Sequence, residues 1–115
     1  MNKNIILITG SSSDIGKEVI KSFLSDKNIL LATYNKNELK IKKKLKEKII
    51  KFKLDLSNED NVVKFIKNIS KKKIIPNKII HIASNPLTMS SFSDLNWIDY
   101  EKSFNIQIRS FFIIL

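Results

Sequence analysis

Residues 5–17 read IILITGSSSDIGK, and this stretch decides the fold. The apolar run over residues 5–8 is short and continuous, as in a strand that is buried on both faces of a parallel sheet. A polar turn from Gly10 to Gly16 separates it from apolar residues that recur at helical spacing, namely Ile15, Val19, Ile20, Phe23 and Leu24. A strand, a turn of small residues and a helix N-terminus together expose backbone N–H groups at the positive end of a helix dipole, which predicts an anion site.

The small residues of the turn have separate roles in this prediction. Gly10 allows a sharp turn where a side chain would clash, and Gly16 allows the helix or a ligand to approach the strand closely. Hydroxyls for phosphate oxygens or for the helix cap are offered by Ser11, Ser12 and Ser13. Asp14 is a further candidate for the cap. The alternative is an ordinary capped helix that binds no ligand.

The rest of the chain alternates strands with helices. Strands are predicted at residues 29–33, 50–54 and 79–83, helices at 36–47, 58–72 and from about 96 to the end, and a loop at 84–95. Ser57 or Asn58 caps the helix at 58–72. Lysines alternate with apolar residues in the third strand, which is typical of a sheet edge and fits a strand order of 3-2-1-4. The pattern predicts an α/β fold, a Rossmann-type doubly wound parallel sheet, in one domain over residues 1–115.

Composition excludes several kinds of protein. No cysteine is present, so we expect neither disulfides nor a thiolate metal site, and a reducing compartment, the cytoplasm, is the predicted location. No apolar run approaches the ~20 residues that span a bilayer. The formal charge of +10 permits a nucleic-acid-binding protein. However, the densest lysine run, 40–48, is expected on the solvated face of a helix, and no aromatic stripe accompanies it.

Residues 9–16, TGSSSDIG, resemble the TGxxxGxG cofactor loop of the classical short-chain dehydrogenases/reductases. Asp14 stands where the family usually has its middle glycine. The resemblance implies that the backbone between Gly10 and Gly16 holds the diphosphate of a nicotinamide dinucleotide. It also places three residues of the turn in the cofactor site, which are Ser12, Ser13 and Ile15.

A second matching segment lies after the third predicted strand. Residues 55–57, Asp-Leu-Ser, are similar to the family's D-[VL]-[ST] segment, which implies that Asp55 contacts the adenine amino group and that Leu56 lies beside it. The alternative is that Asp55 begins a turn or caps the next helix.

The end of the second predicted strand bears on the choice between NAD and NADP. A ribose-binding acid is expected about 20 residues after the glycine loop of an NAD-binding protein. Residues 32–36 read ATYNK and contain no carboxylate, while Lys36 could supply positive charge, so NADP is favoured over NAD. Tyr34 is assigned to the cofactor site, and the alternative is that it only covers the adenine side.

Residues 81–84, HIAS, fall where the family has NNAG, and only Ala83 matches. We assign Ala83 to the cofactor crevice. The single histidine, His81, is expected to be a hydrogen-bonded core residue rather than a base or a metal ligand.

The last predicted helix carries the one candidate for catalysis. Alignment with the family places Gln107 at the asparagine of the catalytic tetrad. Gln107 is expected to share an apolar face with Tyr100, Phe104, Ile108, Phe111 and Leu115. A polar side chain in that stripe needs partners, and the alternative is a glutamine at the edge of a helix–helix contact. The apolar end of this helix also predicts a homo-oligomer, because the family packs this helix in its subunit interface.

The resemblance covers the whole chain but only about the first half of the family's fold. The serine and the YxxxK motif that the family places further on are absent from these residues. We therefore expect the N-terminal part of an NAD(P)-dependent oxidoreductase that acts on a carbonyl or alcohol substrate, similar to 3-oxoacyl reductases. It would be truncated after the fourth strand and the following helix, and would lack the C-terminal catalytic half. The alternatives are an inactive nucleotide-binding fragment and a basic nucleic-acid-binding domain.

Overall fold

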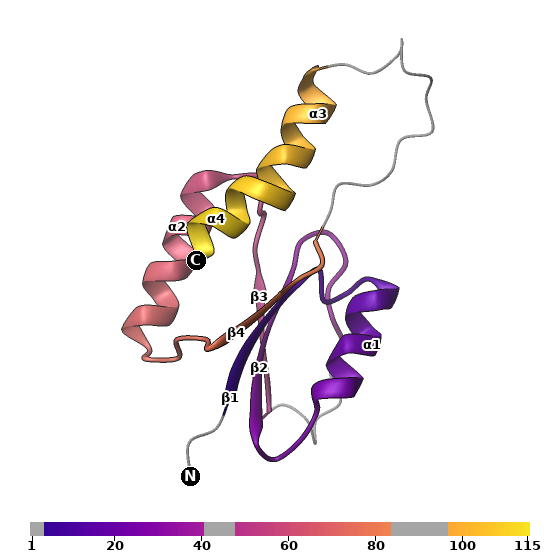
Figure 1. The fold of residues 1–115 in the computed structure, drawn as a ribbon, viewed down its shortest axis with the longest axis vertical. Helices are drawn as coiled ribbons and strands as arrows, with labels where there is room; N and C mark the ends of the chain where they lie inside the picture. The colour runs from indigo at the N-terminus through magenta and orange to yellow at the C-terminus, as the bar shows by residue number, and fades with distance from the viewer. Residues whose placement is uncertain (1–3, 41–47, 84–96) are drawn as a thin grey trace.

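The computed structural model describes residues 4–40, 48–83 and 97–115. Within these residues, four parallel strands form one sheet in the order β3-β2-β1-β4 (Figure 1). The strands are β1 (Asn4–Thr9), β2 (Asn28–Tyr34), β3 (Ile49–Lys53) and β4 (Lys78–His81). The predicted strand order and the α/β class are thus confirmed, with β3 at one edge. Because parallel neighbours need crossovers, helices must lie on the sheet faces.

Helices cover both faces of the sheet, as a doubly wound fold requires (Figure 1). One face packs against α1 (Asp14–Phe23), and the other packs against α2 (Glu59–Lys71) and the last helix. The last helix consists of α3 (Trp97–Phe104), the π-helical segment η3 (Asn105–Arg109) and α4 (Ser110–Ile114).

Side chains of successive residues in the central strands pack alternately into two hydrophobic cores, one on each face of the sheet. Ile6 and Ile8 of β1 join Ile20 of α1 on one face, whereas Leu7 joins the core beneath α2 and the last helix. All four residues from Ile6 to Thr9 are fully buried. A continuous apolar run therefore marks this strand, as the sequence predicted, because a covered sheet leaves no face for polar residues.

Three asparagines join the amino ends of the central strands, and we call them the asparagine clasp (Asn4, Asn28 and Asn77). The Asn77 side chain accepts a bond from the backbone N–H of Ile5 at 3.1 Å and donates to Asn4 Oδ1 at 3.2 Å. Asn4 donates to Asn28 Oδ1 at 3.4 Å. Asn28 in turn donates to the carbonyl of Phe23 at the end of α1, at 2.8 Å.

The predicted helix over residues 36–47 is not formed in its described part. Residues 36–40 are non-helical, and 41–47 lie outside the described residues, as does the predicted loop over 84–95. Leu39 is buried against the α1 face of the sheet. Lys51 of β3 bonds to Glu38 at 2.5 Å and to the Leu39 carbonyl at 3.5 Å, so the segment is tied to the edge strand instead of continuing as a helix.

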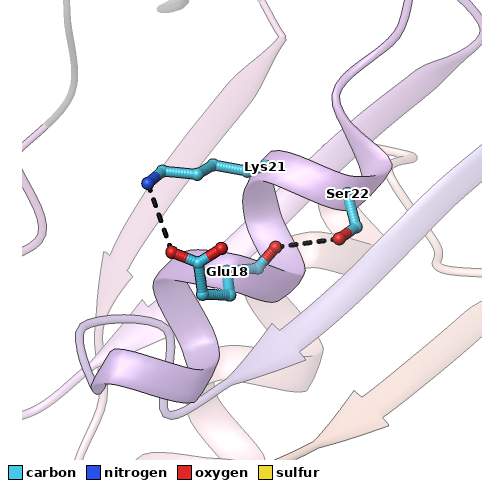
Figure 2. Close-up of polar contacts among 3 residues, drawn as sticks. All are labelled: Glu18, Lys21 and Ser22. Carbon is cyan, nitrogen blue, oxygen red and sulfur yellow. Dashed lines mark hydrogen bonds and ion pairs between the residues drawn. The ribbon is translucent and has the colours of Figure 1, made fainter.

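The outer face of α1 shows how little of its stability comes from the surface. Figure 2 shows Lys21 reaching Glu18 at 3.3 Å, and Ser22 donating to the Glu18 carbonyl at 3.0 Å. Both charged side chains are at least 70% exposed. Exposed pairs of this kind contribute little, so packing of the inner face and the cap at its start hold α1 in place.

The last helix turns a different face to the sheet from the one the sequence predicted. Ile106 and Ser110 are buried, with Ile113 and Ile114 packed on the core. The predicted apolar stripe is instead largely exposed, at Tyr100, Phe104, Ile108 and Leu115. A small side chain at Ser110 allows the helix to approach the core, whereas the bulky residues of the stripe would hold it away.

Candidate functional site

A crevice of about 620 Å³ lies at the carboxyl ends of the strands. In open α/β sheets this is where ligands bind. Its walls include eight of the nine predicted cofactor residues, namely Gly10, Ser12, Ser13, Ile15, Tyr34, Asp55, Leu56 and Ala83. Segments far apart in the sequence are thus brought to one place.

Gly16, the remaining predicted cofactor residue, is buried beneath the turn. A Cβ atom there would lie 2.2 Å from the Gly10 carbonyl oxygen and 2.8 Å from Ser11 backbone atoms. Gly10 has φ +66°, and a Cβ on it would lie 2.8 Å from the Ala83 nitrogen. Glycine is required at both positions, since the neighbouring atoms belong to the backbone and cannot move aside.

The three serines of the turn have three different roles. Ser13 caps α1, because its hydroxyl accepts from the Gly16 N–H at 3.0 Å and donates to the Gly10 carbonyl at 2.8 Å. Ser11 is fully buried and donates to the Thr33 carbonyl at 2.7 Å. The prediction that its hydroxyl is offered to a phosphate is therefore wrong. Only Ser12 keeps its hydroxyl without a bond to the described residues. The prediction of Asp14 as the cap is wrong, because it is the first residue of α1.

Backbone donors converge at the start of α1. The N–H groups of Ser12, Asp14 and Ile15 find no acceptor in the part of the chain that the structure describes. Unpaired N–H groups at a helix start, with the positive end of the helix dipole behind them, form an anion site. The Asp14 carboxylate is exposed, so it can point into solvent away from that site.

Asp55 begins a turn and lines the crevice at the same time. Its Oδ1 accepts from the Ser57 N–H at 3.0 Å and from the Ser57 hydroxyl at 2.6 Å. Its other oxygen has no partner in the described residues and is open to a donor. The cap of α2 is Asn58, whose side chain accepts from the Asn61 N–H at 3.1 Å, so one of the two predicted caps is confirmed.

Two lysines from different elements line the crevice. Lys36 follows β2, and Lys102 comes from α3. Sequence reasoning missed Lys102, although it precedes Ile106, another wall residue, by four positions and so lies on the same side of the helix. The two acids among the crevice residues are Asp14 and Asp55. Neither lies directly after β2, where an NAD-binding protein is expected to have its ribose-binding acid.

His81 is hydrogen-bonded at both ring nitrogens, as expected of a core residue. Nδ1 lies 2.7 Å from the Thr9 hydroxyl, and Nε2 lies 3.0 Å from the carbonyl oxygen of Ile106 in η3. The ring also stacks on Phe111, with centroids 5.3 Å apart. Neither nitrogen is therefore open to a substrate.

Gln107 lies in η3, and the structure places its side chain on the exposed side of the helix. It does not line the crevice, and no hydrogen bond links its amide to the described residues. The structure thus does not bring Gln107 together with the predicted cofactor residues. Its neighbour Ile106 does line the crevice, and Arg109 donates to the Ser57 carbonyl at 3.0 Å, next to the turn that Asp55 begins.

The described residues contain no group of three or more His, Cys, Asp or Glu residues that could hold a metal ion. Nor do they include a helix with the length and apolar character needed to cross a bilayer.

Comparisons with known proteins agree with this architecture. A family model described as short chain dehydrogenase matches residues 4–115. No curated protein matches the sequence. Among solved structures, a short chain dehydrogenase from Leptospira borgpetersenii with bound NAD+ is 18% identical with a TM-score of 0.84, and the match covers 99% of this chain and 44% of that one.

Two further structures match over a similar span. A 4-hydroxyisoleucine dehydrogenase complexed with NADH is 22% identical with a TM-score of 0.81, over 97% of this chain and 46% of that one. A blue fluorescent protein from a metagenomic library, in complex with NADPH, is 16% identical with a TM-score of 0.76, over 98% and 49%. The chain therefore spans less than half the length of these three structures, and at these identities the likeness shows the fold.

Proposed function

This chain belongs to the short-chain dehydrogenase family, and we propose that it is the cofactor-binding part of an NAD(P)-dependent oxidoreductase acting on a carbonyl or alcohol substrate. The observation that carries the proposal is the group of three open N–H groups, from Ser12, Asp14 and Ile15, at the wall of the crevice. A diphosphate fits this donor set, because it is an anion that accepts several bonds from adjacent amides. The dinucleotide, when bound, supplies the hydride carrier.

Each predicted cofactor residue has a role that its surroundings support. The open oxygen of Asp55 accepts a bond from the adenine amino group, and Tyr34 and Leu56 border the adenine. Ala83 leaves room where β4 ends, close to Gly10. Ser13 and Gly16 act through the turn, which they hold in the conformation that exposes the N–H groups.

We propose NADP as the preferred cofactor. An acid after β2 would bind the free ribose hydroxyl of NAD and repel a 2′-phosphate, and residues 34–36 contain none. Lys36 lines the crevice at this point and supplies a cation for the 2′-phosphate.

Titration of the purified chain with NADPH and NADH, followed by cofactor fluorescence, tests both proposals. We expect binding of both, with NADPH tighter. Lys36→Glu should weaken NADPH more than NADH, whereas Lys27→Glu, an exposed lysine outside the crevice wall, should change neither. Binding of neither cofactor would contradict the function, and salt-sensitive retention on DNA would then favour the nucleic-acid-binding alternative.

Turnover is a separate proposal, because the catalytic tyrosine, lysine and serine of the family are not among these residues. We propose that Gln107 takes the tetrad asparagine position and that the substrate resembles a 3-oxoacyl group. The nucleotide sequence after the codon for Leu115 tests this, since a YxxxK motif encoded there would supply the proton donor and its partner. Cofactor binding without any such motif would favour an inactive nucleotide-binding fragment. The cytoplasmic location stays a prediction from composition.

We also propose that the chain forms a homo-oligomer through its last helix. Its exposed side carries large apolar residues, including Trp97, Tyr100, Phe104, Ile108 and Phe112. Exposed apolar surface of this kind commonly marks an interaction site. Sedimentation should show a dimer or larger assembly that Ile108→Lys dissociates, and a monomeric wild type would exclude it.

A further inference from the structure

The π-helical segment η3 has a carbonyl that is released from the normal helix pattern. In an α-helix the Ser110 N–H would bond to the Ile106 carbonyl, but here it bonds to Asn105, five residues back. The Ile106 oxygen instead accepts from the Ser110 hydroxyl and from Nε2 of His81. Side-chain insertion of this kind is a recognised cause of a break in helical bonding.

The hydrogen bonds around His81 define its tautomer. A carbonyl oxygen only accepts, so Nε2 carries the proton and donates to Ile106. The Thr9 hydroxyl already accepts from the N–H groups of Ile82 and Ala83, at 3.1 and 3.2 Å. Its single proton is therefore directed to Nδ1, at 2.7 Å. Each donor in this chain of bonds has one acceptor.

The chain of bonds joins three elements at the edge of the crevice. Thr9 ends β1, His81 ends β4, and Ile106 belongs to the helix that crosses the other side of the site. Stacking of the imidazole on Phe111 fixes the ring plane. Elsewhere the helix is tied by Arg109, which bonds to Ser57 in the loop that also holds Asp55.

We propose that His81 is a positioning residue that docks the η3 segment, through Ile106, onto the cofactor crevice. It acts through the Ile106 carbonyl and touches neither cofactor nor substrate. The consequence for the cofactor rests on the proposed function, but the docking of the helix does not.

Three substitutions test the proposal in the 115-residue chain. His81→Phe keeps an aromatic ring for Phe111 and removes both bonds. His81→Gln keeps an N–H donor that can reach toward Ile106. Ile79→Val is the matched control, since it trims a partly buried neighbour in β4 and breaks no bond to η3.

Amide hydrogen exchange over residues 97–114 is the first readout, and NADPH affinity is the second. His81→Phe should speed exchange in this helix and weaken NADPH binding by about 2- to 10-fold each, as loss of the one hydrogen bond to the Ile106 carbonyl implies. His81→Gln should recover most of both, and Ile79→Val should change neither. Wild-type exchange in His81→Phe, or an equal change in Ile79→Val, would overturn the proposal.

Two further outcomes keep the proposals apart. If the wild-type chain binds no dinucleotide, the proposed function fails while the exchange readout still decides the docking. If His81→Phe does not fold, ¹⁵N spectra of the wild-type imidazole decide it. They should show a slowly exchanging proton on Nε2, and an Nε2 without a proton would overturn the proposal.

Discussion

The glycine turn and the η3 segment, which both border the crevice, differ in how far apart in the sequence their stabilising contacts lie. The glycine turn between β1 and α1 is fixed by residues within a few positions of one another, such as the Ser13 cap and the close packing of Gly16 on Gly10. The η3 turn is fixed from a distance, because His81 lies 25 residues before Ile106. Local sequence patterns therefore predict the glycine turn, but they do not reveal the contact between His81 and η3.

The largest effect is expected at the glycine turn. Gly16→Val would drive a branched side chain into the Gly10 carbonyl, so the free energy of unfolding should fall by about 3 kcal/mol and cofactor binding should be lost. Lys17→Val, which places the same side chain at an exposed position of the same helix, should change stability by only about 0.5 kcal/mol. Urea unfolding and NADPH titration measure the two effects. Similar results for both variants would show that the turn is not tightly packed.

The next comparison is between the two faces of the last helix. Ile106→Ala should cost about 2 kcal/mol, because it leaves a cavity in the core beneath the helix. Ile108→Ala, at a side chain that is 56% exposed, should cost about 0.5 kcal/mol or less in a monomer. Urea unfolding at a protein concentration too low for association would measure both. A larger loss of stability for Ile108→Ala than for Ile106→Ala would mean that the face predicted from the sequence packs on the core after all.

The two helix caps separate stability from binding. Ser13→Ala and Asn58→Ala each remove a side chain that accepts from a backbone N–H at a helix start, so each should cost about 1 kcal/mol. Only Ser13→Ala should also weaken NADPH, because the Ser13 hydroxyl holds the turn that presents the anion site. Equal loss of affinity in both variants would mean that the cap has no special role in binding.

The smallest effect is expected at a contact remote from both turns. The hydrogen bond and charge of Lys51 hold the pKa of the Glu38 carboxyl below its ordinary value of 4.5. A lowered folded-state pKa adds stability above the unfolded pKa, and that stability is lost as pH falls through the lowered value. Unfolding midpoints of Lys51→Met should therefore depend less on acid pH than those of the wild type. Lys53→Met should retain most of that dependence, and cofactor affinity should change in neither variant.

The fold could be predicted because its signals are short-ranged. The mainly apolar runs at 5–8 and 29–33 and the amphipathic pattern of α2 each lie within one element, and alternation of strands with helices then limits the topology. The predicted cofactor residues came mainly from the family resemblance, and eight of them line one crevice because parallel strands bring their carboxyl ends to one edge. The helix predicted at 36–47 failed in its described part because Leu39 and Glu38 are held by other elements, which no local pattern records.

The candidate site was predictable only on one side. Lys102 and Ile106 reach the crevice because of the phase of the last helix, and that phase is set by contacts of Ile106 and Ser110 with the core. A helical wheel drawn from the bulkiest residues selects the opposite face, with Gln107 on it. An unbroken 3.6-residue period also does not predict η3, where the Ile106 carbonyl accepts bonds from His81 and from the Ser110 hydroxyl.

The asparagine clasp lies at the end of the sheet away from the crevice, so it can align the strands without contacting a bound ligand. Sliding β4 past β1 by one residue would break the paired amides of Asn77 with Asn4 and Ile5, so strand alignment is guarded at that end. At the opposite ends the Thr9 hydroxyl bonds to His81 and to the N–H groups of Ile82 and Ala83, so β1 and β4 are joined there too. Exposed crevice residues outside this pairing, such as Lys36, can therefore change which molecule is held while the sheet keeps its register.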